Sequence, residues 1–208
     1  MLRARIIPCL LIKNGGLVKT VNFANPKYVG DPINAVKIFN EKEVDEIIVV
    51  DIDASVTGAE PNYERIRNLA AECRMPLCYG GGVTRAEQAA RIIGMGVEKV
   101  ALSAAAINNP ALVQELAGIV GAQSVVVVLD VRRDPKHGAY EVYTHNGTRA
   151  TGHEPANLAA EMEARGAGAT NDVASLNEFL VACERLRRIL VAHNIGSGAH
   201  GLSGEGTQ

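Results

Sequence analysis

Residues 76–94, PLCYGGGVTRAEQAARIIG, contain the signals that decide the fold. A short apolar run, Pro76–Tyr79, leads through three glycines into an amphipathic stretch. Thr84 and Glu87 stand three residues apart, which is the spacing of a capping box at a helix N-terminus. A run without alternation between apolar and polar residues is typical of a strand buried on both faces of a parallel sheet. The segment therefore predicts a βα unit.

The same order of strand, turn and helix repeats along residues 1–168, at intervals of about 30 residues. Helices are expected where Asp31 and Asn109 each precede a proline, because Asp and Asn are good N-caps and Pro fits the first helical position. A further helix is expected over Pro155–Arg165. The five apolar runs predicted to be strands are Arg5–Ile12, Glu46–Ile52, Pro76–Tyr79, Glu98–Ser103 and Ser124–Asp130.

The number of these units indicates an α/β fold, an incomplete (β/α)8 barrel of the TIM type. Eight units would need roughly 240 residues, and the chain has 208. No sixth strand is expected directly after the fifth unit, because Ala169–Ser175 is polar. We expect a partial barrel in residues 1–168, with a β-hairpin turning at Asn146-Gly147 after the fifth strand, a remnant helix in 169–193 and a flexible tail in 194–208. An unclosed sheet has two free edges, which predicts self-association.

The composition excludes several classes of protein. The formal charge of -2 and the aromatic content of 4% without Trp argue against a nucleic-acid partner. No apolar run is long enough to span a membrane, and no signal peptide is expected. Cysteines occur at positions 9, 73, 78 and 183 without a CxxC pair or metal-ligand spacing. They are expected to be free thiols in a reducing cytoplasm, and no metal or cofactor is predicted.

Candidate site residues follow the expected strands, where active sites of parallel α/β folds lie. Gly80–Gly82 precede a capped helix, which favours phosphate binding through backbone N–H groups, or else forms only a tight turn. Asp130 follows an apolar run, so burial could raise its pKa into a range suited to acid–base chemistry. The alternative is a structural role for Asp130, as a cap of the next element or in an ion pair with Arg132 or Arg133. Asp51 has the same ambiguity.

A second set of charged residues, Arg5, Glu46 and Lys99, stands at the opposite ends of three expected strands. These side chains could meet as an ion-pair cluster at the floor of the barrel. Taken alone, the residues favour a structural role as a solvated cap.

Together the motifs resemble the cyclase subunit of imidazole glycerol phosphate synthase, over Met1–Gly168. The resemblance implies a (β/α)8 barrel with phosphate sites at its mouth and a glutaminase partner docked on its floor. Ammonia from that partner would cross the barrel and react with a phosphoribulosyl aminoimidazole substrate, giving imidazole glycerol phosphate and an aminoimidazole carboxamide ribotide. This is a lyase of histidine biosynthesis in the cytoplasm. The segments that carry the resemblance are Arg5–Leu10, Gly30–Pro32, Val49–Ser55, Tyr79–Val83, Glu98–Val100 and Val125–Asp130.

The resemblance also implies roles for particular residues. Asp130 matches the general acid or base at the end of the fifth strand. Arg5, Glu46 and Lys99 match three members of a four-charge ring that gates ammonia. The positions implied to bind the phosphorylated substrate are Lys19 (in a mobile loop after the first strand), Asp51, Gly81, Gly82 and Ser103.

Three departures from the family pattern matter for function. The family's second catalytic aspartate, at the end of the first strand, is Leu11 in this chain. The fourth member of the charge ring falls on Ala169, and the glycine-rich ends that form the second phosphate site are not present. Losing one positioned acid or base typically lowers a rate ~10²–10⁴-fold.

These departures leave three functions open. The first is a cyclase-type subunit with one catalytic carboxylate. The second is a non-catalytic ammonia conduit, because Leu11–Gly16 resembles a paralogous branch thought to serve amidation of a surface-polysaccharide sugar. The third is an inactive, truncated remnant.

Overall fold

The computed structural model describes residues 5–21, 24–133 and 139–168. The chain divides into two compact units, Met1–Asn171 and Asp172–Gln208. All described residues belong to the first unit, so the predicted remnant helix and tail lie outside them.

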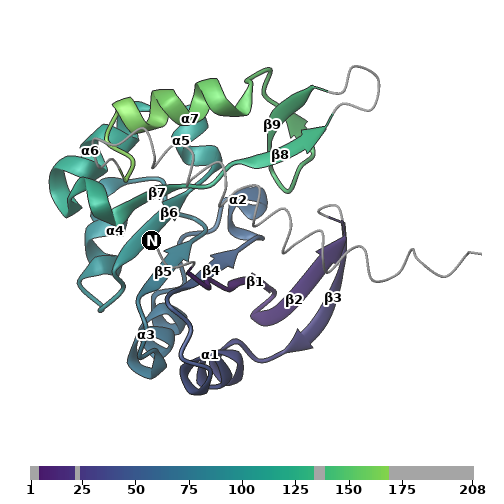
Figure 1. Ribbon diagram of the computed structural model, residues 1–208, viewed down its shortest axis with the longest axis vertical. Helices are drawn as coiled ribbons and strands as arrows, with labels where there is room; N and C mark the ends of the chain where they lie inside the picture. Colours follow the sequence, from purple (N-terminus) through teal and green to yellow (C-terminus); the bar gives the residue numbers. More distant parts are fainter. Residues whose placement is uncertain (1–4, 22–23, 134–138, 169–208) are drawn as a thin grey trace, which may run out of the picture. The chain divides into compact units, whose positions relative to one another are not determined.

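Five parallel strands form the centre of the described unit (Figure 1). Their order in the sheet follows their order in the chain, as expected for successive βα units. The first strand is shorter than predicted and begins after Pro8, which has no N–H to donate, although its carbonyl accepts from Ile48. The strands are β1 (Cys9–Lys13), β4 (Ile47–Asp51), β5 (Leu77–Gly80), β6 (Lys99–Leu102) and β7 (Val125–Val127).

Helices follow the strands near the predicted places, although the helix predicted to be capped by Asn109 begins at Ala111 without a side-chain cap. Asp31 caps the first by accepting from the Asn34 N–H at 3.0 Å. The capping box is displaced by one residue, because the side-chain oxygen of Gln88, not Glu87, accepts from the Thr84 and Arg85 N–H groups. The helices are α1 (Pro32–Glu41), α2 (Ala54–Thr57), α3 (Tyr63–Glu72), α4 (Ala86–Ile93), α5 (Ala104–Asn108), α6 (Ala111–Val120) and α7 (Pro155–Ala164), and a 3-10 turn covers Ala122–Ser124.

A β-hairpin that the sequence interpretation missed follows β1. It consists of β2 (Gly16–Val21) and β3 (Ala24–Gly30), both antiparallel additions to the sheet on the free side of β1. Asn14 and Gly15, with φ of 49° and 84°, make the turn between β1 and β2. Lys19 therefore lies in a strand and not in the mobile loop that was predicted.

A second sheet follows β7, as the predicted hairpin requires. It contains β8 (Asp130–Arg133), β9 (Tyr140–Thr144) and β10 (Arg149–Ala150). His145, Asn146 and Gly147 make the turn, all with positive φ. The Asn146 side-chain N–H donates to the Ile52 carbonyl at 3.1 Å, which ties this turn to the end of β4. Asp130 belongs to β8, so the fifth parallel strand ends earlier than predicted.

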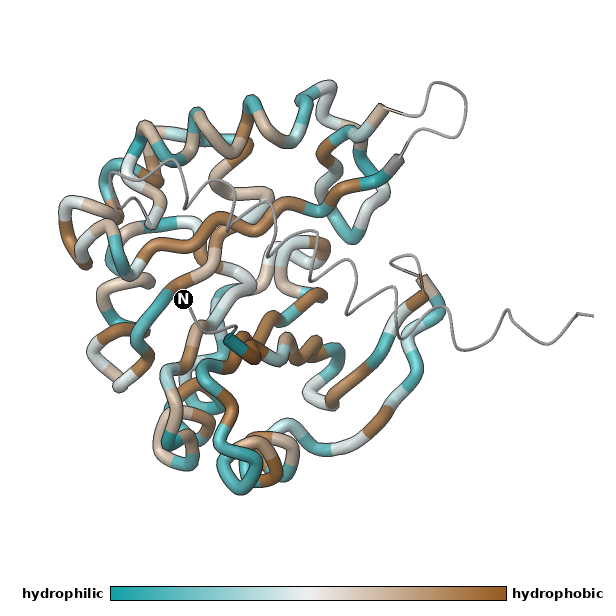
Figure 2. The backbone as a smooth tube through the Cα atoms, viewed as in Figure 1, coloured by the Kyte–Doolittle hydropathy of each residue, from teal (hydrophilic) through white to brown (hydrophobic). Residues whose placement is uncertain are grey.

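The helices cover one face of the parallel sheet. Side chains on that face, such as Ile12, Val49 and Val125, are completely buried, and the apolar strands stand out at the centre of Figure 2. On β1, the alternate positions Cys9 and Leu11 are only half-buried. The helix-covered face is therefore the hydrophobic core.

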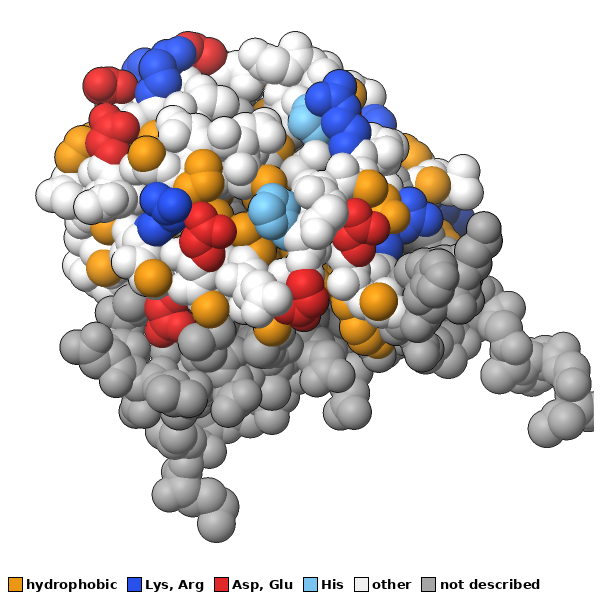
Figure 3. All heavy atoms as spheres, turned by 90° about the horizontal axis from the view of Figure 1, so that it is seen from above, with side chains coloured by type: hydrophobic (Ala, Val, Ile, Leu, Met, Phe, Trp, Pro, Cys, Tyr) orange, Lys and Arg blue, Asp and Glu red, His pale blue; other side chains and the backbone are white. Residues whose placement is uncertain are grey.

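The outer surface over α7 carries acidic and basic side chains interspersed, without one dominant sign (Figure 3). No helix in the described part of the chain is long and apolar enough to cross a membrane.

Candidate functional site

A cluster of three charged side chains lies at the amino ends of the parallel strands. Glu46 stands directly before β4 and is only 3% exposed. Its carboxylate accepts from Arg5 Nη2 at 2.6 Å and from Lys99 Nζ at 2.7 Å. The structure thus brings together Arg5, Glu46 and Lys99, the three residues that the resemblance assigns to a gate. Ala169, the fourth position, lies outside the described residues.

The buried carboxylate of this gate cluster is paired with two cations. Burying a carboxylate is costly unless it is paired, and two cations here pair it. The Arg5 side chain remains 54% exposed, so the cluster borders solvent on one side. The Cys78 thiol is near Glu46, and burial, with a contribution from Glu46, raises its pKa.

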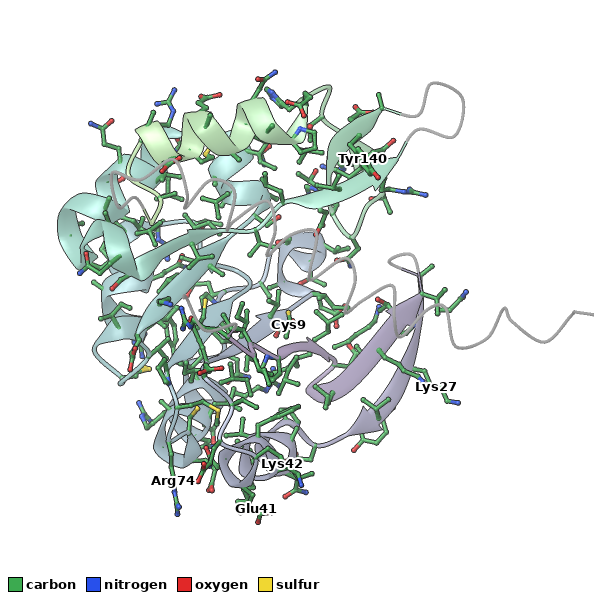
Figure 4. All side chains as sticks on the ribbon, viewed as in Figure 1. Cys9, Lys27, Glu41, Lys42, Arg74 and Tyr140 are labelled. Carbon is green, nitrogen blue, oxygen red and sulfur yellow. The ribbon has the colours of Figure 1, made fainter. Side chains whose placement is uncertain are left out.

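Asp130 lies beyond the carboxyl end of β7, at the first position of β8. Burial raises the pKa of its carboxyl group to about 6. The Cys9 thiol, on β1, has its pKa raised to about 12 by burial and secondarily by the charge of Asp130, so the two groups lie close enough to interact (Cys9 is labelled in Figure 4). A carboxyl group with a pKa near neutrality can donate or accept a proton under ordinary conditions.

An ion pair of Asp130 with Arg132 is not formed, because the Arg132 side chain is engaged elsewhere. Its guanidinium donates to the Gly147 carbonyl at 2.8 Å and lies over the ring of Tyr143, 5.2 Å from the centroid. The side chain of Arg133 lies outside the described residues.

Leu11 occupies the same face of β1 as Cys9, because side chains two apart on a strand point the same way. Its neighbours in the sheet are Val50 on β4 and Val18 on β2. An apolar side chain thus stands where the resemblance implies a catalytic aspartate. Leu11 therefore adds an apolar side chain to the face of β1 that carries Cys9, the residue whose thiol interacts with Asp130.

The glycine loop after β5 is built for close backbone packing. Gly81 and Gly82 have φ of 112° and 75°, a region that favours glycine. A Cβ at Gly81 would lie 2.5 Å from the Asp51 carbonyl oxygen, and one at Gly82 would lie 2.5 Å from the Ala59 carbonyl oxygen. The tight-turn interpretation alone accounts for both glycines, and phosphate binding at the loop stays a prediction. Ser103, predicted to serve the same site, stands directly before α5.

Replacing Gly82 with alanine is expected to lower the free energy of unfolding by about 3 kcal/mol, since strained φ and a backbone clash add together. Urea unfolding followed by circular dichroism measures it. Gly118→Ala is the matched control: Gly118 lies within α6 and a Cβ there meets nothing within 4 Å, so this variant should be stabilised by up to about 1 kcal/mol. Equal stability of Gly82→Ala and the wild type would contradict the packing argument.

Asp51 forms an ion pair with Arg65, a residue that was not predicted from the sequence to belong to the site. Its carboxylate accepts from Arg65 Nη1 on α3 at 3.3 Å and from the backbone N–H of Asp53 at 3.1 Å. Asp53 in turn accepts from the Asn14 N–H at 2.9 Å and lies 3.5 Å from Lys13 Nζ. These contacts hold the ends of β1 and β4 together, and no local pattern pairs residues so distant in sequence. Lys19 is exposed and stands opposite Lys27 in the β2–β3 hairpin.

No group of three or more His, Cys, Asp or Glu side chains in the described ranges could hold a metal ion. The arrangement therefore consists of a buried charge cluster at one end of the strands and a buried carboxyl group at the other.

The sequence model of a family described as "Histidine biosynthesis protein" matches residues 5–173. The chain belongs to this family. Its α/β fold, with five βα units of a barrel in the described residues, agrees with the predicted fold class.

Named relatives place the chain within the family. It is 53% identical over 168 residues to a protein of Leptospira borgpetersenii provisionally named imidazole glycerol phosphate synthase subunit HisF, and 52% identical to the provisionally named hisF2 subunit of Pseudomonas aeruginosa. It is 40% identical to imidazole glycerol phosphate synthase subunit HisF of Lactococcus lactis. These matches cover 81% of the chain and 66%, 66% and 65% of the relatives, so the chain spans slightly less than two thirds of their length.

Proposed function

We propose that the chain is a cyclase-type subunit of imidazole glycerol phosphate synthase. It receives ammonia from a glutaminase subunit and combines it with a phosphoribulosyl aminoimidazole substrate. The products are imidazole glycerol phosphate and an aminoimidazole carboxamide ribotide. A cytoplasmic location goes with this function.

The observation that carries the proposal is the placement of two buried charged groups at opposite ends of the same parallel strands. The gate cluster of Arg5, Glu46 and Lys99 lies at the amino ends. Asp130, with its pKa raised to about 6, lies beyond the carboxyl end of β7. This arrangement suits passage of ammonia from one end to a reaction at the other.

Each site residue has a chemical task in this proposal. The gate cluster contacts the glutaminase side and admits ammonia. Asp130 transfers the protons that ring closure and release of the ribotide require. Gly81, Gly82 and Ser103 offer backbone N–H groups to one substrate phosphate. Asp51, held at the end of β4 by Arg65 of α3, contributes to substrate binding beside this loop. Lys19 supplies a positive charge from the hairpin.

The test is turnover of the phosphoribulosyl aminoimidazole substrate with ammonium salt as the nitrogen source, with products separated and identified by mass spectrometry. The proposal expects both products in equal amounts, formed only when ammonium is present. Substrate recovered unchanged from a folded chain would contradict it.

A second function, an ammonia conduit for another amidating enzyme, is favoured by Leu11. Its side chain cannot transfer a proton, while the gate cluster is complete in its three described members. The chain is also more similar to the provisionally named hisF2 protein than to HisF of Lactococcus lactis. A conduit needs the gate and does not need two acid–base groups.

Replacing Leu11 with aspartate distinguishes the two functions. If the chain is a cyclase with one missing group, the variant should turn over the substrate about 100-fold faster than the wild type, the typical contribution of one positioned acid or base. Leu11→Asn, which is polar but transfers no proton, is the matched control. No gain in the aspartate variant would favour the conduit.

A further inference from the structure

Tyr28, on β3, has an aromatic ring that packs against Gly16 on one side and is otherwise exposed to solvent. Its side chain is 67% exposed. A Cβ built at Gly16 on β2 would lie 2.7 Å from Cε2 and 2.8 Å from Cδ2 of the Tyr28 ring. The ring therefore lies directly on the Gly16 backbone, and the absence of a side chain at position 16 makes room for it.

The register of the strands places Tyr28 on the same face as Leu11. Leu11 is paired with Val18, and Val18 with Tyr28, so the three side chains form one row across β1, β2 and β3. Two interstrand spacings separate Tyr28 from Leu11, about 10 Å. Cys9 lies on this face as well, and the charge of Asp130 contributes to the raised pKa of its thiol. Lys27 alternates with Tyr28 and extends away from the sheet (Figure 4).

We infer that Tyr28 is the stacking residue for the aminoimidazole ring of the substrate. This rests on the proposed function and names the residue that recognises the heterocycle. The row of Leu11, Val18 and Tyr28 carries no charge, so it suits a planar ring and not a phosphate group. Aromatic side chains bind heterocycles by stacking in a way that tolerates changes in ring substituents. Tyr28 thus favours a ligand that carries a planar ring over a ring-free phosphate ester, while other residues bind the phosphates.

The test is the affinity of two ligands, measured by calorimetry: aminoimidazole carboxamide ribotide and, as the ring-free probe, ribose 5-phosphate. Tyr28→Ala is expected to weaken ribotide binding about 10- to 100-fold, the usual loss for a stacking side chain, and to leave ribose 5-phosphate binding unchanged. Tyr28→Phe should bind both ligands like the wild type. Gly16→Ala should weaken only the ribotide, because the added Cβ displaces the ring.

Tyr140→Ala, on β9, is the control for loss of another exposed tyrosine and should bind like the wild type. Circular dichroism checks that each variant is folded. Equal weakening of both ligands by Tyr28→Ala would overturn the inference, as would unchanged ribotide affinity. A wild-type chain that binds neither ligand would instead contradict the proposed function, and the role of Tyr28 with it.

Discussion

Replacing Asp130 with asparagine is expected to lower ammonium-driven turnover about 10²- to 10⁴-fold. Asparagine keeps the size of the side chain but cannot exchange a proton. Because position 11 on β1 is leucine, no carboxylate there can transfer the proton in place of Asp130. The measurement is initial velocity at saturating ammonium. The exposed Glu115→Gln on α6 is the control and should leave the rate unchanged. Unimpaired turnover in Asp130→Asn would contradict the assigned role.

The same residue predicts a pH dependence of stability. The pKa of Asp130 is raised from 3.8 to about 6, so the native state holds a proton that the unfolded state has released between these values. Stability contributed by the protonated form is therefore lost as pH rises through that interval. Asp130→Asn should be more stable than the wild type at pH 8, by up to about 3 kcal/mol. The difference should vanish near pH 3.5, and urea unfolding at both pH values checks it.

Replacing Glu46 with glutamine is expected to lower the free energy of unfolding by about 3 kcal/mol. The change leaves Arg5 and Lys99 facing each other without their shared counter-charge, and breaking a buried pair from one side typically costs about 3–5 kcal/mol. The lower end applies because the Arg5 and Lys99 side chains are 54% and 27% exposed and can be rehydrated. Urea unfolding at pH 7 measures the change.

A matched control comes from the ion pair of Arg85 and Glu60, which has the same 2.6 Å separation as Arg5 and Glu46. Both of its side chains are more than half exposed. Glu60→Gln should therefore change stability little, since exposed pairs are screened by water. If Glu46→Gln were as stable as Glu60→Gln, burial would not be what makes the gate cluster important.

The fold could be predicted wherever burial leaves a pattern in the sequence. Runs such as Ile47–Asp51 are apolar without alternation, as expected for strands of a parallel sheet. Asp31-Pro32 marks a helix start through backbone chemistry. The β2–β3 hairpin was missed for the same reason. All residues of β3 except Gly30 are exposed, so no periodicity distinguishes this strand from a loop.

Parts of the candidate site could also be predicted from the sequence, and other parts could not. The run Gly80–Gly82 indicated a tight turn after the strand, and Gly81 and Gly82 have positive φ there. The gate cluster was foreseen because three charged residues stand at the same ends of strands in one parallel sheet, although β5 lies between β4 and β6. The contact of Asp51 with Arg65 was not, because it depends on how α3 packs over the end of β4. Pairing between distant elements leaves no local signal.

Nitrogen transfer tests the central claim most directly. The chain is incubated with ¹⁵N-ammonium and the phosphoribulosyl aminoimidazole substrate, and the products are analysed by mass spectrometry. The account predicts one ¹⁵N atom in imidazole glycerol phosphate and none in the aminoimidazole carboxamide ribotide. Failure of ¹⁵N to enter imidazole glycerol phosphate, in a chain that binds the substrate, would show that ammonia does not react at this site.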